Sequence, residues 1–280
     1  LNTEWLRSFL AVVENDGFIR AADHLHKTQS TISQHIRKLE ETLDTSLFEA
    51  EGRRKVLSPA GQAFKGYAQR MLELQQDAFL ATRQSDLQGQ LRIGVSHSLG
   101  EGLFPSILSR FARAFPDVGF SVDVGQSQQL AQHYDRGEYD LILTLETQPQ
   151  VGEVLSQESM VWIGHEDFSW HTGTGTLPLA AFNTPCHFRK ASIEALDQAG
   201  IPWQMVYNAN SLPGLQAAIQ AGLGVTVRAR HAVTQGTRIL GKEFGLPRLP
   251  PIYVVLRNRS VNATSQLLAE VFSQQGLPAA

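Results

Sequence analysis

The chain has 280 residues, of which 42% are apolar, and a formal net charge of −3. This length and composition predict a folded chain of about two or three modules and exclude one that is disordered throughout. Because the total charge is close to zero, a nucleic-acid partner would have to be bound by charge that is gathered locally.

The cysteine content and the hydropathy pattern narrow the class further. The single cysteine, Cys186, excludes an internal disulfide and a cysteine-rich zinc site, which fits a reducing compartment. No cationic N-terminal region precedes an apolar segment, and no apolar run reaches the roughly 18 residues that a membrane span needs. We therefore expect a cytoplasmic protein with no membrane partner.

Residues 1 to about 57 have the pattern of short helices joined by turns. Apolar residues recur at helical spacing in three stripes, the first of which is interrupted at Gly17. The stripes comprise Trp5, Leu6, Phe9, Leu10, Val12 and Val13, then Ala21, Ala22 and Leu25, then Ile32, Ile36, Leu39 and Leu43. They predict a compact helical head.

A long helix is predicted to follow the head, from Pro59 to about Leu87. Ser58 suits an N-cap and Pro59 the first helical position. Apolar residues then recur at steps of four and three, at Ala60, Phe64, Tyr67, Met71, Leu74, Ala78 and Ala81. About 28 helical residues would span roughly 40 Å, more than the head can bury, so the pattern favours a homodimer formed through residues 59–88. The alternative is a helix that packs on its own chain.

After Gly89 the pattern changes to strands that alternate with helices. The predicted strands are 91–95, 119–124, 139–143, 160–163, 203–207, 224–227 and 252–256. The predicted helices are 103–115, 128–136, 193–198, 214–222 and 263–273. This alternation predicts a mostly parallel sheet covered on both faces, in two similar α/β halves with a cleft between them.

Three histidines fall in the seventeen residues from His24 to Glu40, which raises the question of a metal site, a membrane-surface helix or a DNA-binding surface. His24 and His26 lie on different faces of a helix and His35 lies beyond a turn, so the spacing that zinc needs on one helix is absent. A membrane-surface helix needs a larger and continuously basic face.

A helix-turn-helix fits the same segment. Thr28 would cap a second helix that buries Ile32, Ile36 and Leu39 and exposes hydrogen-bonding side chains near its N-terminus. The exposed set is Gln29, Ser30, Ser33 and Gln34 for base edges, with Arg37 and Lys38 for phosphates. Residues 17–38 carry four cations and one acid, whereas residues 1–87 carry eleven cations and twelve acids. The alternative is an ordinary polar helix on a small bundle.

Several longer motifs occur together along the chain. They are Phe18-Ile-Arg-Ala-Ala-Asp-His-Leu-His, Gln29-Ser-Thr-Ile-Ser-Gln-His-Ile-Arg-Lys-Leu-Glu40, Leu47-Phe, Gly52-Arg-Arg, Leu57-Ser-Pro-Ala-Gly61, Arg136-Gly-Glu-Tyr-Asp-Leu141 and Ala221-Gly-Leu-Gly-Val225. With these motifs the sequence resembles the LysR-type transcriptional regulators over essentially its full length. The runs 185–189 and 196–203 are most similar to the HexA-like subgroup, which contains regulators of motility, virulence and secondary metabolism.

The resemblance implies an architecture. It consists of an all-α winged helix-turn-helix head (1–58), a dimerisation linker helix (59–88) and an α/β effector domain (89–280). The effector domain has two lobes similar to periplasmic solute-binding proteins, with lobe I at 89–160 and 260–280 and lobe II at 161–259. The implied partners are double-stranded promoter DNA, a small-molecule effector, further copies of the chain in a homotetramer and, as a candidate, RNA polymerase.

The resemblance also implies residue roles in DNA binding. Gln29, Ser30 and Ser33 would read bases and Arg37 would contact a phosphate, while a wing would carry Arg53, Arg54 and Lys55. Family members usually have an arginine where this chain has Ala50, so one contact near the wing is missing. Each lost phosphate contact lowers the salt dependence by about one unit. Binding is then expected to be weaker unless Arg54 or Lys55 compensates.

Six polar side chains are predicted to line an effector cleft. Ser96 and Ser98, Ser127 and Thr144 follow the first three strands, at the edge where α/β sheets form clefts, and Arg189 and Ser211 belong to the second lobe. Helix N-termini near these serines and the Arg189 guanidinium favour an anion such as an organic acid. We expect no other cofactor and no metal. The alternative for each of the six residues is that it only caps a helix and binds no ligand.

Two motifs raise the question of catalysis. Gly94-Val-Ser96-His-Ser98 resembles a GxSxG nucleophile elbow, but Ser98 replaces the second glycine that the tight turn needs. Cys186 and His187 are adjacent, so their side chains are expected to point apart. We therefore expect a regulator and not an enzyme. A solute-binding or sensing protein without specific DNA binding is the competing hypothesis, and a hydrolase is a more remote one.

Overall fold

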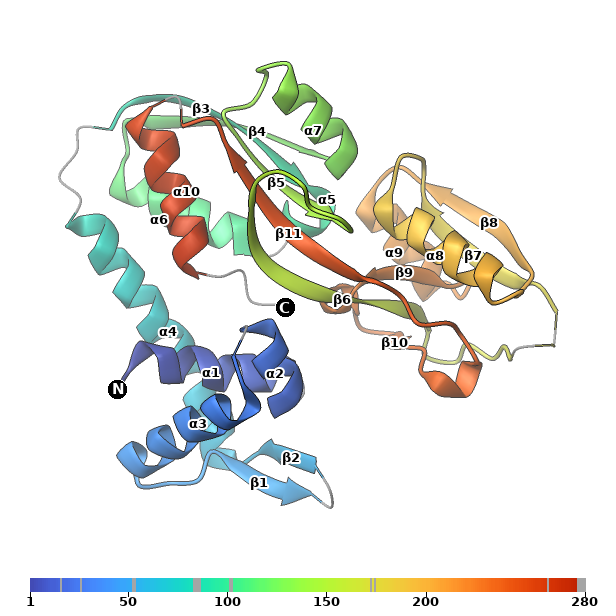
Figure 1. Cartoon of the computed structure of the whole chain (residues 1–280), viewed down its shortest axis with the longest axis horizontal. Helices are drawn as coiled ribbons and strands as arrows, with labels where there is room; N and C mark the ends of the chain where they lie inside the picture. The colour runs from blue at the N-terminus through green and yellow to red at the C-terminus, as the bar shows by residue number, and fades with distance from the viewer. Residues whose placement is uncertain are drawn as a thin grey trace.

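The computed structural model describes residues 1–15, 17–25, 27–51, 54–82, 87–100, 103–171, 173, 175–260 and 262–275. An N-terminal head is joined by one long helix, α4, to a larger α/β part that consists of two lobes (Figure 1). None of the helices in these ranges is both long and apolar enough to cross a membrane.

In the residues described, the head has three helices and a hairpin. Its elements are α1 (Thr3–Glu14), α2 (Phe18–His24), α3 (Gln29–Leu43), β1 (Phe48–Glu51) and β2 (Arg54–Leu57). Phe9 is fully buried at the centre, where its ring lies 5.6 Å from that of Phe48 and 5.4 Å from that of Phe64. The expected helical head is confirmed, and the antiparallel hairpin β1–β2 adds a two-stranded wing to it.

The linker helix α4 (Pro59–Ala81) is shorter than the helix predicted to reach Leu87. Ser58 caps it as expected, because its side chain accepts a hydrogen bond from the Gly61 amide. The repeated apolar positions divide between two surroundings. Phe64 and Met71 pack against the head, whereas the side chains of Tyr67 and Leu74 are 58% and 68% exposed. Part of the expected dimer seam is therefore used within the chain, because the head covers one side of α4.

The α/β part begins with β3 (Gly89–Ser96) and ends with α10 (Ala263–Gln275). Between them lie α5 (His97–Gly100), α6 (Leu103–Ala114), β4 (Val118–Gly125), α7 (Ser127–Asp135), β5 (Leu141–Glu146), β6 (Glu153–His165), β7 (Leu177–Phe182), α8 (His187–Gln198), β8 (Trp203–Ala209), α9 (Leu212–Gln220), β9 (Thr226–Ala229), η1 (Arg230–Ala232), β10 (Thr237–Ile239), η2 (Lys242–Phe244) and β11 (Pro251–Asn258). Strands β7 and β10 were not among the predicted elements.

The main sheet is mixed, which corrects the prediction of a mostly parallel sheet. Its strand order is β10-β6-β11-β5-β3-β4, and β9 also pairs with β6. Strand β3 is parallel to β4 and β5, but β11 is antiparallel to both β5 and β6, and β6 is antiparallel to β9 and β10. The alternation of strands and helices did not reveal this, because the last strand returns between two strands that are distant from it in the sequence.

Two lobes share this sheet. Lobe I contains β3, β4 and β5, and lobe II contains the parallel pair β7–β8 together with β9 and β10 (Figure 1). The long strands β6 and β11 extend from one lobe towards the other. Strand β11 is hydrogen-bonded to β5 along Tyr253–Asn258. It therefore belongs to the lobe I sheet, although the expected boundary placed residues up to 259 in lobe II.

Candidate nucleic-acid interface and effector cleft

Helix α3 has one buried and one exposed face. The Thr28 side chain caps it by accepting a hydrogen bond from the Thr31 amide at 3.2 Å. Ile32, Ile36 and Leu39 are buried against the rest of the head. This packing fixes which side chains of α3 point away from the protein.

The exposed face carries the predicted DNA-contacting residues. All six side chains expected there are exposed: Gln29, Ser30, Ser33, Gln34, Arg37 and Lys38. Arg37 donates to Glu41 at 2.8 Å, in a pair on the surface of the same helix. The Lys38 ammonium lies 5.8 Å from the centre of the Trp5 ring. The two cations lie one helical turn further along α3 than Ser33 and Gln34.

His35 serves to hold the head together. Its Nδ1 lies 2.7 Å from the hydroxyl of Ser8, a fully buried residue of α1. Burial lowers the pKa of His35, and the positive charge of Lys27 lowers it further. A neutral imidazole bound to α1 is a structural link between two helices, and not an extra cation for phosphates at neutral pH.

The hairpin places a cation opposite Ala50, the position at which family members usually have an arginine. Lys55 is the cross-strand partner of Ala50, and its ammonium lies 5.3 Å from the centre of the Phe18 ring. Arg53 and the side chain of Arg54 lie outside the described residues. The hairpin is positioned against α3 because the carboxylate of Glu40 accepts hydrogen bonds from the first residues of the hairpin segment, the amides of Leu47 and Phe48.

A cleft lies between the two lobes. Its empty space, including the part open to solvent, is about 380 Å³. It is lined by Ser96, His97, Ser98, Gly125, Gln126, Ser127, Leu145, Phe182, Pro185, Cys186, His187, Phe188 and Arg228. Three of the six predicted effector residues, Ser96, Ser98 and Ser127, therefore meet here.

The other three predicted residues lie elsewhere. Thr144 is fully buried in β5 and donates to Glu146 at 2.9 Å. Arg189 lines a smaller neighbouring hollow and donates to Asn208 at 2.7 Å. Ser211 is exposed and caps α9 by accepting a hydrogen bond from the Gly214 amide.

Sequence reasoning missed the cation of the cleft, Arg228. This residue is 5% exposed, and its guanidinium donates a hydrogen bond to the hydroxyl of Ser98. It also lies 4.4 Å from the centre of the Phe188 ring and 5.2 Å from that of Phe182. The available signal was an arginine directly after the predicted strand 224–227, since an arginine beside a buried strand is usually paired.

Cys186 and His187 both line the cleft, at the start of α8. Burial lowers the pKa of His187, whereas the negative charge of Glu146 opposes this effect. Glu146 is itself ion-paired with Arg257 at 2.7 Å. His187 is therefore expected to be a neutral side chain at the cleft near pH 7.

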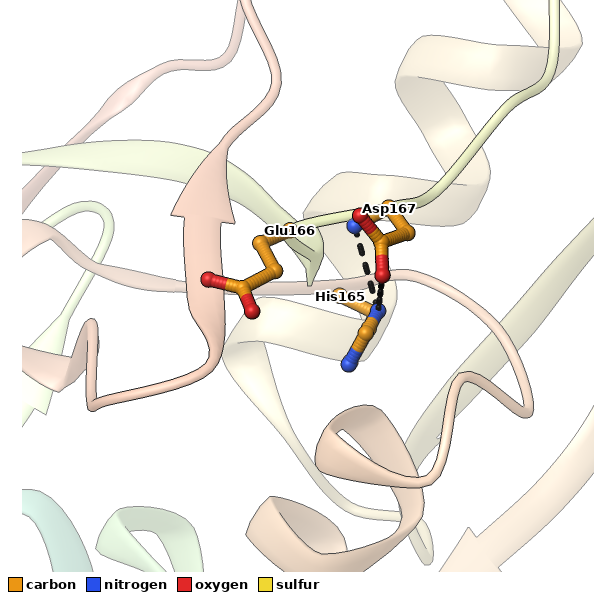
Figure 2. Close-up of side chains that lie close together, drawn as sticks. All are labelled: His165, Glu166 and Asp167. Carbon is orange, nitrogen blue, oxygen red and sulfur yellow. Dashed lines mark hydrogen bonds and ion pairs between the residues drawn. The ribbon is translucent and has the colours of Figure 1, made fainter.

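Three consecutive side chains at the end of β6 come close together: His165, Glu166 and Asp167 (Figure 2). Their candidate ligand atoms all lie within 4.8 Å of one another. However, His165 Nδ1 already accepts a hydrogen bond from the Asp167 amide at 3.1 Å. Glu166 and Asp167 are exposed, so the geometry is that of a surface turn stabilised by its histidine.

A helix-turn-helix head joined by a long helix to two lobes around a cleft defines a ligand-responsive DNA-binding protein. The family model described as bacterial regulatory helix-turn-helix protein, lysR family, matches residues 3–62, and that of the LysR substrate binding domain matches residues 84–276. The chain belongs to the LysR family of DNA-binding transcriptional regulators.

Similar sequences include named regulators. The HTH-type transcriptional regulator PecT of Dickeya dadantii is 35% identical over 260 residues, which cover 92% of this chain and 82% of PecT. The regulator DgdR of Burkholderia cepacia is 28% identical over 258 residues, which cover 92% of this chain and 87% of DgdR.

Solved structures share the fold over the full length. DarR of Vibrio fischeri, solved in complex with DNA, has a TM-score of 0.54 at 18% identity, and the match covers 98% of this chain and 98% of DarR. HinK of Pseudomonas aeruginosa has a TM-score of 0.54 at 17% identity, and the match covers 100% of this chain and 99% of HinK.

Proposed function

We propose that α3 binds promoter DNA in the major groove, with Gln29, Ser30 and Ser33 at base edges. Arg37 and Lys38 contact the flanking phosphates, and the wing contacts the adjoining backbone through Lys55, Arg53 and Arg54. One observation carries this proposal. All six predicted DNA-contacting residues of α3 are exposed, whereas the opposite face of the helix is buried. Short polar side chains at the start of such a helix suit base reading, and cations suit phosphates.

Alanine at both Gln29 and Ser33 should lower the affinity for a specific site by about tenfold or more, while binding to unrelated duplex changes little. The reason is that these side chains would contact bases and not phosphates. Fluorescence anisotropy with the DNA beside the chain's own gene, or with fragments from a genomic pull-down, measures both affinities.

Thr42→Ala, an exposed position at the far end of α3, is the matched control and should leave both affinities unchanged. If neither DNA source contains a specifically bound fragment, the proposed function is wrong. An equal loss on specific and unrelated DNA would assign Gln29 and Ser33 a general role in binding instead.

We further propose that α4 forms the dimer and that two dimers make a tetramer. The exposed faces of Tyr67 and Leu74 support this proposal, because the two residues are seven positions apart on one side of the helix. A tetramer would present several heads to one promoter.

Glutamate at both Tyr67 and Leu74 should dissociate the dimer, because two charges per chain would be buried in an apolar contact. Light scattering after size-exclusion chromatography measures the mass. Gln69→Glu is the control, since Gln69 is exposed about 200° around α4 from Tyr67 and should leave the mass unchanged. A double variant that keeps the wild-type mass would refute the α4 interface.

The cleft is proposed to hold a small-molecule effector that alters lobe closure and so the spacing of the DNA-binding heads. Ser96 supports this proposal, because it is 4% exposed at the cleft and its hydroxyl has no hydrogen-bond partner among the described residues. An effector can shift the equilibrium only by its difference in affinity for the two states. We also propose that the chain acts in the cytoplasm, as a regulator and not as an enzyme. The proposed domain limits lie between residues 58 and 59 and between residues 88 and 89.

A further inference from the structure

Arg228 brings a permanent positive charge into the cleft. Arginine stays ionised in proteins, and this one is 5% exposed. It comes from β9 in lobe II, whereas its hydrogen-bond acceptor, Ser98, comes from α5 next to β3 in lobe I. A single side chain thus links the two walls of the cleft.

Hydrogen-bonding capacity remains beside this cation. The hydroxyl of Ser96 and Oε1 of Gln126 are buried at the cleft without hydrogen-bond partners in the described parts of the chain. A buried hydroxyl without a partner costs free energy, so a ligand that bonds to it gains affinity. Glu146, the acidic group that acts on His187, is ion-paired with Arg257.

Apolar side chains also line the cleft near Arg228. The rings of Phe182 and Phe188 lie against the guanidinium, and Leu145 and Pro185 continue the lining. A site with one fixed cation, a few hydroxyls and aromatic walls suits a ligand with an anionic head and an apolar body.

We propose that Arg228 selects the charge of the effector by binding its carboxylate together with the hydroxyls of Ser96 and Ser98. The apolar body of this small organic acid lies against Phe182 and Phe188. Arg228 therefore takes the role of the capturing cation, while Arg189 donates hydrogen bonds within lobe II, to the Phe182 carbonyl and to Asn208. This inference rests on the proposed effector role of the cleft and names the class of its ligand.

The test is calorimetric titration of the full chain, without DNA, with phenylacetate and with its neutral analogue phenylacetamide. Phenylacetate should bind wild type at least about tenfold more tightly than phenylacetamide. Arg228→Gln should remove that preference by weakening phenylacetate alone. Lys190→Gln changes an exposed cation of α8 and is the matched control that should leave both affinities unchanged, whereas Arg189→Gln should keep the preference for phenylacetate.

Because Arg228 is buried, folding of each variant is checked by its melting curve. Two milder variants complete the test. Ser96→Ala, which leaves the arginine in place, should weaken phenylacetate several-fold, and Arg228→Lys should keep part of the preference. Equal affinities for the two probes, no binding of either by wild type, or a larger loss in Arg189→Gln would overturn the proposal. Promoter binding of the wild type is measured in a separate experiment. A wild-type chain that does not bind promoter DNA would refute the proposed regulatory function, whereas the affinities for the two probes would still test the role of Arg228.

Discussion

Replacing Gly61 by alanine should lower the free energy of unfolding of the head by about 3 kcal/mol. A Cβ atom at this position would lie 2.1 Å from the backbone oxygen of Leu47 and 2.9 Å from Cδ2 of Leu57. The Leu47 oxygen already accepts a hydrogen bond from the Ser58 amide at 3.0 Å. Backbone atoms cannot rotate aside as the end of a flexible side chain can, so the start of α4 and the wing must separate.

Gly66→Ala is the matched control in the same helix. A Cβ atom at Gly66 meets nothing within 4 Å, so this variant should be stabilised by up to about 1 kcal/mol through its higher helix propensity. Pulsed hydrogen exchange through a urea transition of the full chain, read on peptides from α1 and α4, measures both effects. Equal effects of the two substitutions would show that the contact of Gly61 with Leu47 does not limit the packing of the head.

Glu14→Gln should stabilise the head above pH 7 by up to about 3 kcal/mol and should remove a pH dependence that the wild type shows. Burial raises the pKa of Glu14 from 4.5 to about 7, and attraction to Lys65 opposes this rise. Oε2 of this carboxylate is buried without a hydrogen-bond partner in the described residues, and Glu14 is the last residue of α1, where the helix dipole also disfavours a negative charge.

The direction of this pH dependence follows from the protonation of Glu14 in the folded and the unfolded chain. Between pH 4.5 and about 7 the folded head keeps the proton that the unfolded chain has lost, so stability falls as pH rises through this window and levels off above it. Melting temperatures of the full chain at pH 5, 6, 7 and 8 check this trend in wild type and variant. Glu49→Gln, at an exposed position of the wing, is the control and should keep the wild-type trend. A Glu14→Gln chain with the same trend as wild type would contradict the prediction.

The elements with a strong local signal were predictable. Thr28 and Ser58 cap the helices that they were expected to cap, and Ile32, Ile36 and Leu39 are buried as their spacing indicates. The exposed face of α3 follows from that burial, because side chains on a helix have a fixed angular spacing. The same local rule applied to α4 identified its apolar positions, but it did not reveal that Phe64 and Met71 pack on the head.

The order of strands in the sheet and the cation of the cleft depended on contacts between distant segments. Ser96 ends β3 and Ser98 lies two residues beyond it, where the local pattern already indicates a cleft edge. Arg228 reaches Ser98 across 130 positions of sequence, because β9 pairs with β6 and brings lobe II against α5. Helix caps and burial stripes are determined by neighbours within a few residues, so the amino-acid sequence alone specifies them. The antiparallel return of β11 and the choice of Arg228 over Arg189 at the cleft arise only when the whole chain is packed.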